Sequence, residues 1–188
     1  GAVRDAVALL ARERVARGLR EGSPELELRT LGLTSQLRRD VEEALQQCTR
    51  LKVINLNKNQ LVEVPNAVCA LTQLEKLNLI NNQLVEVPNA VGALTQLKVL
   101  YLGNNPLSEE AEERARRIRT MARVEQAKEN IAECLREGST RPNLLALDLT
   151  SPLPRDVEEA LQQCTHPEDL DFRRHQLVEV PNAVGALP

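Results

Sequence analysis

The chain has 188 residues, of which 42% are hydrophobic and 27% charged, a composition typical of a folded protein and not of a disordered one. Its net charge of -3 argues against a dedicated nucleic-acid binder, because neutralising several phosphates requires a basic face. No apolar run approaches the roughly 20 residues that span a bilayer, and no secretory leader precedes the first helix-like segment. We therefore expect a cytoplasmic protein without a membrane partner.

The first predicted element is an amphipathic helix over residues 3–21, which Gly22 ends. Four apolar residues with near-helical spacing form its inward face: Val7, Leu10, Val15 and Leu19. We expect this helix to cover the open edge of the first strand.

A short pattern then recurs at a step of 23 residues. The segments LKVINLNKNQL, LEKLNLINNQL and LKVLYLGNNPL begin at Leu51, Leu74 and Leu97, and each fits LxxLxLxxNxL. An earlier segment, LRTLGLTSQL, begins at Leu28 and has Gln36 where the pattern expects asparagine. The chain thus contains four candidate repeats before residue 108.

This pattern is the signature of leucine-rich repeats, and the chain resembles that family. The resemblance implies an α/β leucine-rich repeat solenoid with short parallel strands and helical caps. A VPxxV segment leads the chain back to the core, and an NPL segment precedes an acidic helix. In these features, residues 3–125 also resemble bacterial cytoplasmic leucine-rich repeat proteins, including those attached to Roco-type GTPases. Because the chain has no GxxxxGK[ST] motif, only a recognition domain is implied.

Alternation within each repeat separates the core from the surface. The inward positions of the second repeat are Leu51, Ile54 and Leu56. Asparagine recurs where the backbone leaves each strand and should satisfy main-chain groups there, forming a ladder of Asn59, Asn82 and Asn105. The octamer LVEVPNAV, which begins at Leu61, Leu84 and Leu177, then returns the chain to the core, and its proline interrupts sheet pairing.

A long capping helix is predicted over residues 108–138. Ser108 stands at the N-cap, and Glu109 and Glu110 follow where the helix dipole favours acidic side chains. Two arrangements remain open at this stage: one continuous helix, or two helices with a break near Thr120.

A longer duplication overlies the repeats at an offset of 116 residues. LREGS begins at Leu19 and again at Leu135, and DVEEALQQCT begins at Asp40 and again at Asp156. Such identity indicates either a recent duplication or a designed sequence. The predicted parts are residues 1–107 (a cap helix and four repeats), 108–138 (a capping and linking helix) and 139–188 (a truncated second unit).

No constellation of residues predicts catalysis, so we expect no enzyme, no cofactor and no metal. His166 and His175 flank two aspartates, but they lie nine residues apart, which matches no common ligand spacing. Cys48 and Cys164 hold equivalent positions on an apolar helix face, which indicates buried structural thiols. The four cysteines contain no CxxC pair.

The surface best suited to function is the outward side of the strands, on the concave face of the expected solenoid. We expect this noncatalytic module to bind a protein or peptide there, with Tyr101 at the centre because tyrosine is enriched at binding hot spots. The predicted contact residues are Val53, Asn55, Asn57, Lys76, Asn78, Ile80, Val99 and Tyr101. Ordinary exposed scaffold residues without a ligand remain an open alternative.

A second hypothesis is a self-assembling scaffold, because the second unit has too few repeats to bury a continuous core alone. Its C-terminal edge would then pair with another copy, giving a homo-oligomer with a dimer favoured. The predicted self-association residues are Leu177, Val180, Val184 and Leu187.

If that edge is an interface, Val184→Glu should dissociate the oligomer without unfolding the first unit, because a buried unpaired charge opposes association. Light scattering over a range of concentrations measures the mass. A monomeric wild-type chain, or a variant with unchanged mass, would remove the edge from the interface.

Overall fold

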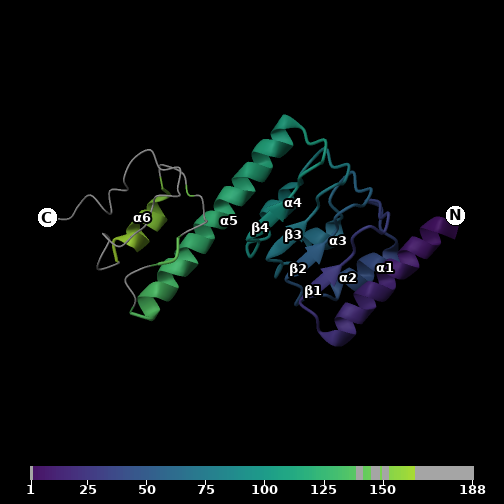
Figure 1. The fold of residues 1–188 in the computed structure, drawn as a ribbon, viewed down its shortest axis with the longest axis horizontal. Coiled ribbons are helices and arrows are strands. Elements are labelled where there is room, and N and C mark those ends of the chain that lie inside the picture. The colour runs from purple at the N-terminus through teal and green to yellow at the C-terminus, as the bar shows by residue number, and fades with distance from the viewer. Residues whose placement is uncertain (1, 139–141, 145–148, 150–152, 164–188) are drawn as a thin grey trace. The chain divides into compact units, whose positions relative to one another are not determined.

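The computed structural model describes residues 2–138, 142–144, 149 and 153–163. The chain divides into two compact units, residues up to Arg119 and residues from Thr120 onward, which are treated separately below. Unit 1 contains α1 (Ala2–Glu21), β1 (Glu25–Glu27), α2 (Arg39–Gln46), β2 (Val53–Asn55), α3 (Asn66–Cys69), β3 (Lys76–Asn78), α4 (Asn89–Gly92), β4 (Val99–Tyr101) and the first part of α5 (Glu109–Arg136) (Figure 1). Unit 2 contains the rest of α5 and α6 (Arg155–Leu161).

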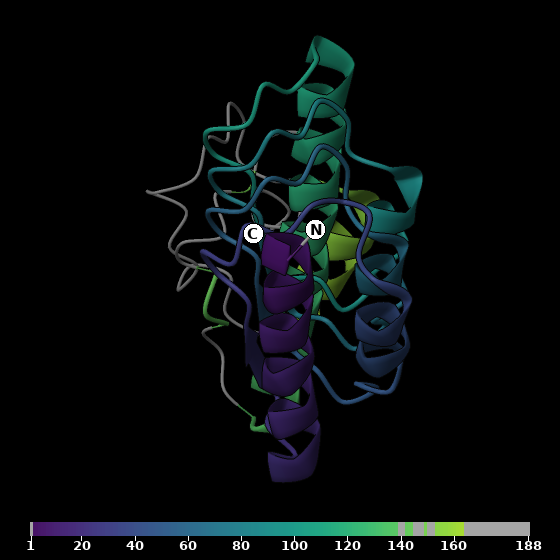
Figure 2. The same ribbon diagram turned by 90° about the vertical axis from the view of Figure 1, so that its right-hand side faces the viewer.

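The sheet of unit 1 has four parallel strands in the order β1-β2-β3-β4, as the repeats predict. Each strand is three residues long and buries its middle residue, while the residues on either side face outward. The short helices α2, α3 and α4 follow the strands in turn and stack in one column (Figure 2). The expected α/β architecture of parallel strands with helical connections is confirmed.

The register of the first strand differs from the prediction. β1 pairs Leu26 with Ile54, so the first repeat is built on residues 25–27, and the predicted alignment, which starts the repeat at Leu28 and puts Leu31 level with Ile54, is wrong. Leu31, and not Gln36, therefore takes the place that Asn59 has in the second repeat. The physical reason is that each ladder asparagine forms hydrogen bonds with main-chain groups of the preceding repeat. No repeat precedes the first one in this sheet, so the first repeat needs no asparagine at this place.

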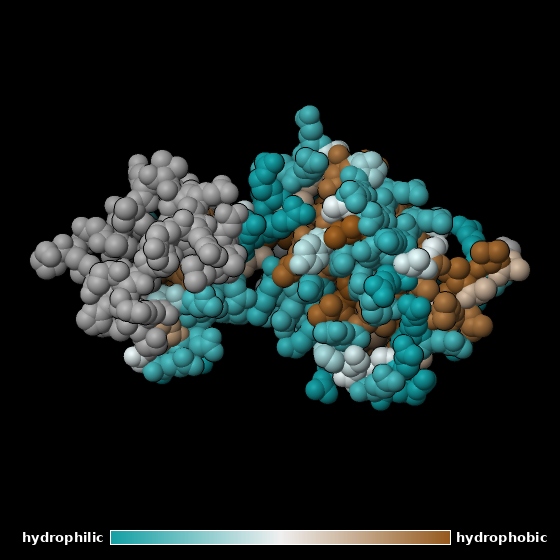
Figure 3. All heavy atoms as spheres, viewed as in Figure 1, coloured by the Kyte–Doolittle hydropathy of each residue, from teal (hydrophilic) through white to brown (hydrophobic). Residues whose placement is uncertain are grey.

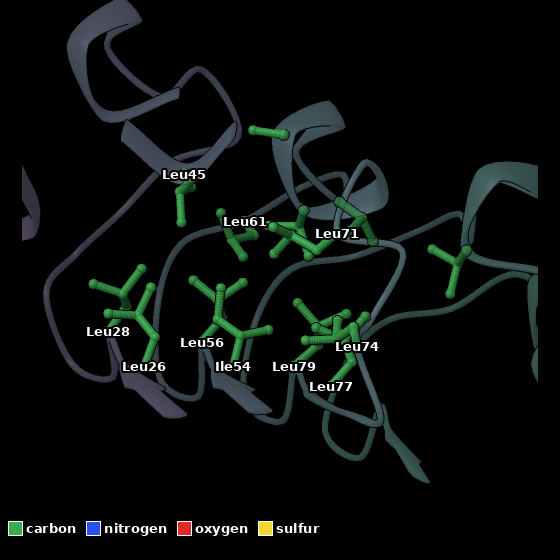
Figure 4. Close-up of a cluster of buried hydrophobic side chains, with 14 of the residues drawn as sticks. Leu26, Leu28, Leu45, Ile54, Leu56, Leu61, Leu71, Leu74, Leu77 and Leu79 are labelled. Carbon is green, nitrogen blue, oxygen red and sulfur yellow. The ribbon is translucent and has the colours of Figure 1, made fainter. Parts of the chain in front are cut away.

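Leucines in layers fill the interior, because the chain has one tyrosine, one phenylalanine and no tryptophan. Leu28, Leu56 and Leu79, from three successive repeats, are each less than 2% exposed. Figure 4 shows them beside Leu26 and Leu77, which come from the strands themselves. Fully burying one such side chain stabilises the fold by about 1.5–3 kcal/mol. Each repeat buries several leucines against its neighbour, so the packing between repeats is a large part of the stability.

The predicted amide ladder is present, with the members Asn59, Asn82 and Asn105. Asn82 is 7% exposed. Its Nδ2 donates to the carbonyl of Leu56 at 3.0 Å and of Leu79 at 2.9 Å, and its Oδ1 accepts from the amide of Leu61 at 3.1 Å. One side chain thus satisfies main-chain groups of its own repeat and of the preceding one.

The turn that follows each strand has one residue in the left-handed region. The residues are Thr30, Lys58, Asn81 and Asn104, with φ of 58°, 55°, 55° and 56°. Asparagine tolerates this region better than most L-residues, whereas a β-branched residue tolerates it worst, so Thr30 carries the largest local strain of the four. The first repeat has this turn although Leu31, and not an asparagine, comes next.

Three of the four predicted inward residues of α1 face the core: Val15 is fully buried, and Val7 and Leu19 are half-buried against it. The fourth, Leu10, is 42% exposed, and Ala8 and Ala11 are buried instead. These small side chains let the helix approach β1 and α2 closely, and Leu9 and Leu10 point outward. The predicted role of the helix, covering the first strand, is confirmed by its contacts with β1.

The capping helix α5 runs from Glu109 to Arg136 as one element, so a break near Thr120 is wrong. Ser108 is its N-cap, because the Ser108 hydroxyl accepts from the amide of Ala111 at 3.1 Å. In unit 1 the helix buries Ala111, Ala115 and Ile118.

Unit 2 has its own apolar cluster, which contains Ala127, Ile131, Leu144, Leu149, Leu153, Val157 and Leu161. Each of these lies 116 residues after an apolar residue that unit 1 buries or half-buries. The agreement supports the predicted duplication, which stays a prediction.

Asn82→Ala should lower the free energy of unfolding by about 3 kcal/mol, because it leaves buried main-chain groups of two repeats unpaired. Urea unfolding followed by circular dichroism measures the loss. The matched control is Asn89→Ala, since Asn89 is exposed at the start of α4 and should change stability by less than about 0.5 kcal/mol. Equal effects of the two substitutions would contradict the role of the ladder.

Candidate binding face of the sheet

The side of the sheet away from the core carries the predicted contact residues. We call this surface the open face and define it as Glu25, Glu27, Val53, Asn55, Asn57, Lys76, Asn78, Ile80, Val99 and Tyr101. All eight residues predicted from the sequence belong to it. None of its members is buried.

Sheet register gathers the open face into two rows that cross the strands. The first row aligns Val53 with Lys76, and Lys76 with Val99. The second aligns Asn55 with Asn78, and Asn78 with Tyr101. Because neighbouring strands lie about 4.8 Å apart, successive side chains of a row are in reach of one ligand.

Tyr101 is the one aromatic ring of the open face and is 42% exposed. The Nζ of Lys76 lies 5.7 Å from the centroid of its ring. A cation at this distance is attracted by the ring face, by about 0.5–1 kcal/mol at exposed sites. The pair places a charge, a hydroxyl and an apolar ring side by side at β3 and β4.

Asn55 and Asn78 are held by the turns that follow their strands. The Oδ1 of Asn55 accepts from the amide of Asn57 at 3.0 Å, and the Oδ1 of Asn78 accepts from the amide of Ile80 at 3.1 Å. This fixes each amide so that its Nδ2 is the free end. Within residues 2–138, neither Nδ2 donates to another group, so both can donate to carbonyl or carboxylate oxygens of a ligand.

Sequence reasoning missed Glu25 and Glu27, which extend the two rows onto β1. Both are exposed, and Glu27 forms an ion pair with Arg29 at 3.4 Å. The strict alternation ELEL over residues 25–28 was the signal that could have found them. The open face therefore runs from acidic at β1 to lysine and tyrosine at β3 and β4.

A line of charges borders the open face one residue before each of β2, β3 and β4. The Nζ of Lys52 lies 2.7 Å from Glu75 Oε1, and the Nζ of Lys98 lies 3.8 Å from Glu75 Oε2. The hydrogen bond from Lys52 is the main reason that the pKa of Glu75 is lowered, with attraction to both lysines adding to it. This carboxylate links three repeats at the rim.

The thiols fit structural roles. Cys48 is buried and Cys69 half-buried, and burial raises the pKa of both, which opposes the reactive thiolate form. Cys164, His166 and His175 lie outside the described residues, as do Leu177, Val180, Val184 and Leu187. Among the residues that are described, no group of three or more His, Cys, Asp or Glu could hold a metal ion. None of the described helices is long and apolar enough to cross a membrane.

Comparison with known sequences points to one family. The leucine rich repeat model matches residues 49–107, which contain β2, β3 and β4. No curated protein matches the chain significantly.

Solved structures give similarities of limited extent. A leucine-rich repeat protein of Leptospira interrogans is 33% identical over 40% of this chain and 19% of its own, with a TM-score of 0.38. An internalin of Listeria monocytogenes is 34% identical over 37% of this chain and 20% of its own, with a TM-score of 0.34. The BIR2 ectodomain of Arabidopsis thaliana is 33% identical over 44% of this chain and 42% of its own, with a TM-score of 0.36.

This chain spans about a fifth of the first two of those proteins, and the TM-scores are low, so nothing about function follows from them. The repeat pattern and the family model agree over one part of the chain. The parallel strands, the asparagine ladder and the family match together show that residues 49–107 are leucine-rich repeats, and their strands and connections have the α/β fold of such repeats.

Proposed function

We propose that this chain is a noncatalytic interaction module that binds a protein or peptide segment on the open face. Leucine-rich repeats support a protein-interaction role in general. The observation that carries the specific proposal is the second row, in which Asn55, Asn78 and Tyr101 stand in register on three neighbouring strands.

The chemistry of this row suits a peptide backbone. The Oδ1 atoms of Asn55 and Asn78 are occupied by the following turns, which leaves their Nδ2 groups as donors for carbonyl oxygens of an extended segment. Val53 and Val99 offer half-buried aliphatic surface beside them. Tyr101 adds a large ring with little side-chain entropy to lose, which is why tyrosine often dominates binding energy.

Charge on the open face suggests the polarity of the bound segment. Glu25 and Glu27 lie at the β1 end, and Lys76 lies two strands away on β3. A segment with a basic side chain over β1 and a carboxylate over β3 would complement both ends. The same complementarity would raise the association rate at low salt.

Self-assembly through the C-terminal edge remains our second proposal. Its supporting observation is that residues 177–187 repeat the sequence of residues 84–94 without a change. In unit 1 that segment is covered by α5, where Arg114 Nη1 donates to the carbonyl of Val87 at 2.7 Å. The Val184→Glu measurement described above tests it.

The open face is tested by selecting peptides of about 12 residues, long enough to cross the four strands, from a displayed random library against the whole chain. Tyr101→Ala should weaken the selected peptides by about tenfold or more, because it removes the aromatic contact. Asn78→Asp keeps the oxygen that accepts from Ile80 but removes the Nδ2 donor, and should weaken them less. Fluorescence anisotropy measures both affinities.

Thr72→Ala is the matched control, since Thr72 is exposed and lies outside the open face. It should leave every affinity unchanged. Amide chemical shifts that move on binding should cluster at residues 53–57, 76–80 and 99–101. If the selected peptides bind both variants as well as the wild type, the open face is not the binding site.

A further inference from the structure

The outer side of α1 is a second apolar surface that the fold does not use. Val3 is 79% exposed, Leu9 56% and Leu10 42%. Val3 and Leu10 lie seven residues apart on one side of the helix, Leu9 lies next to Leu10 around it, and all three are outside the face of Ala11 and Val15, which are fully buried. Figure 3 shows the resulting hydrophobic patch at the N-terminal end of the helix. We define the outer face of α1 as Val3, Leu9, Leu10, Arg12, Arg17 and Arg20.

The second copy of this helix provides an internal comparison. In α5, the residues 116 positions later are Ala127 and Ile131 on the buried side, both fully buried. On the outer side, however, Leu9 and Leu10 are replaced by Glu125 and Gln126. The same cap helix therefore forms with polar residues at these positions.

The leucines of α1 are thus not required for helix formation or for packing on the repeats. Large exposed apolar side chains oppose solubility unless something covers them, and a patch of them commonly marks an interaction site. The difference between the two copies indicates that α1 has a partner that this part of α5 lacks.

Charge around the leucines indicates what that partner is. A shallow hollow on the helix surface is lined by Leu9, Leu10, Arg12, Glu13, Arg14, Ala16, Arg17 and Arg20. Four of these eight side chains are cationic and one is acidic. α5 has Glu133 at the position of Arg17 and Asn130 at the position of Arg14, whereas Lys128 and Arg136 keep the charges of Arg12 and Arg20. The positive charge is therefore higher on α1, and Arg17 is the residue that differs most.

We propose that the outer face of α1 docks an acidic amphipathic helix of a partner protein. The partner's apolar side chains would pack against Leu9 and Leu10, and its carboxylates would bind Arg12, Arg17 and Arg20. An amphipathic helix matches a narrow apolar stripe through residues at i, i+3, i+4 and i+7. Arginine favours carboxylates because its planar group can form two parallel hydrogen bonds.

Two other occupants fit less well. A second copy of α1 would bring two sets of arginines together, and like charges at an interface oppose association. A lipid surface needs the apolar residues on one side of the helix and the charges on the other, whereas Leu9, Leu10 and the arginines line one hollow.

The test uses the whole chain and a labelled synthetic peptide of about 18 residues, with leucines at helical spacing and glutamates elsewhere. Fluorescence anisotropy should show binding that weakens as salt rises. The double variant Leu9→Glu, Leu10→Gln gives α1 the residues of α5, so it should keep the thermal midpoint while losing affinity by about tenfold or more. Arg17→Glu should also weaken binding and reduce its dependence on salt.

Val62→Gln is the matched control, because Val62 is 54% exposed in the β2–α3 connection and should not affect the peptide. Tyr101→Ala should also leave this affinity unchanged, which separates this surface from the open face. The proposal is overturned if the double variant binds the acidic peptide normally, or if a peptide with lysines in place of glutamates binds equally well. Leucine-dependent binding to phosphatidylserine vesicles without peptide binding, or leucine-dependent dimerisation of the chain, would overturn it in favour of the other occupants.

Discussion

The buried amide of each ladder asparagine is the interaction on which the repeat array depends. Where the backbone turns away from a strand, its carbonyls and amides enter the interior without a sheet partner, and leaving them unpaired costs about 1–3 kcal/mol for each group. Asn59 solves this for the first two repeats: its Nδ2 donates to Leu28 and Leu56, and its Oδ1 accepts from Leu31 and Leu33. Asn82 and Asn105 repeat the arrangement one step further along. The amides thus fix how the turn of each repeat meets the repeat before it.

Leucine layers add the second constraint. With hardly any aromatic residue, the interior is filled by side chains of nearly one size, so every repeat presents the same surface to the next. Identical steps keep the strands in register, and register brings Asn55, Asn78 and Tyr101 into one row. The open-face positions point away from this packing, and Lys76 between Val53 and Val99, or Tyr101 beside Asn78, shows different residue types in one row. The open face is thus a surface on which residues can change without disturbing the packing behind it.

The sequence predicted the central repeats well because their signal is local. The inward leucines, the asparagine and the 23-residue step of the segments at Leu51, Leu74 and Leu97 all agree, and the predicted open-face residues of those repeats lie in the register expected. The first repeat failed because the asparagine that fixes the register is absent there. Leu31 stands in its place, the strand was set too late along the chain, and Glu25 and Glu27 were lost from the open face as a result.

The cap helix shows a different limit of sequence reasoning. Hydrophobicity favours Leu10 over Ala8 and Ala11 as an inward residue, but the distance between helix and sheet decides which side chains fit. That distance is a property of the packed unit and cannot be predicted from the local sequence pattern. The leucines that packing leaves exposed belong to the outer face of α1.

The ladder also has a direction. Each asparagine forms hydrogen bonds with main-chain groups of the preceding repeat and of its own repeat, and within residues 2–138 forms none with the repeat that follows. During synthesis, which proceeds from the N-terminus at roughly 5–20 residues per second, every new repeat therefore arrives carrying the group that finishes the one already made. Growth from the N-terminus would thus complete the main-chain hydrogen bonds of each repeat when the next one arrives, while the leucine layer of the newest repeat stays exposed until its neighbour packs on it.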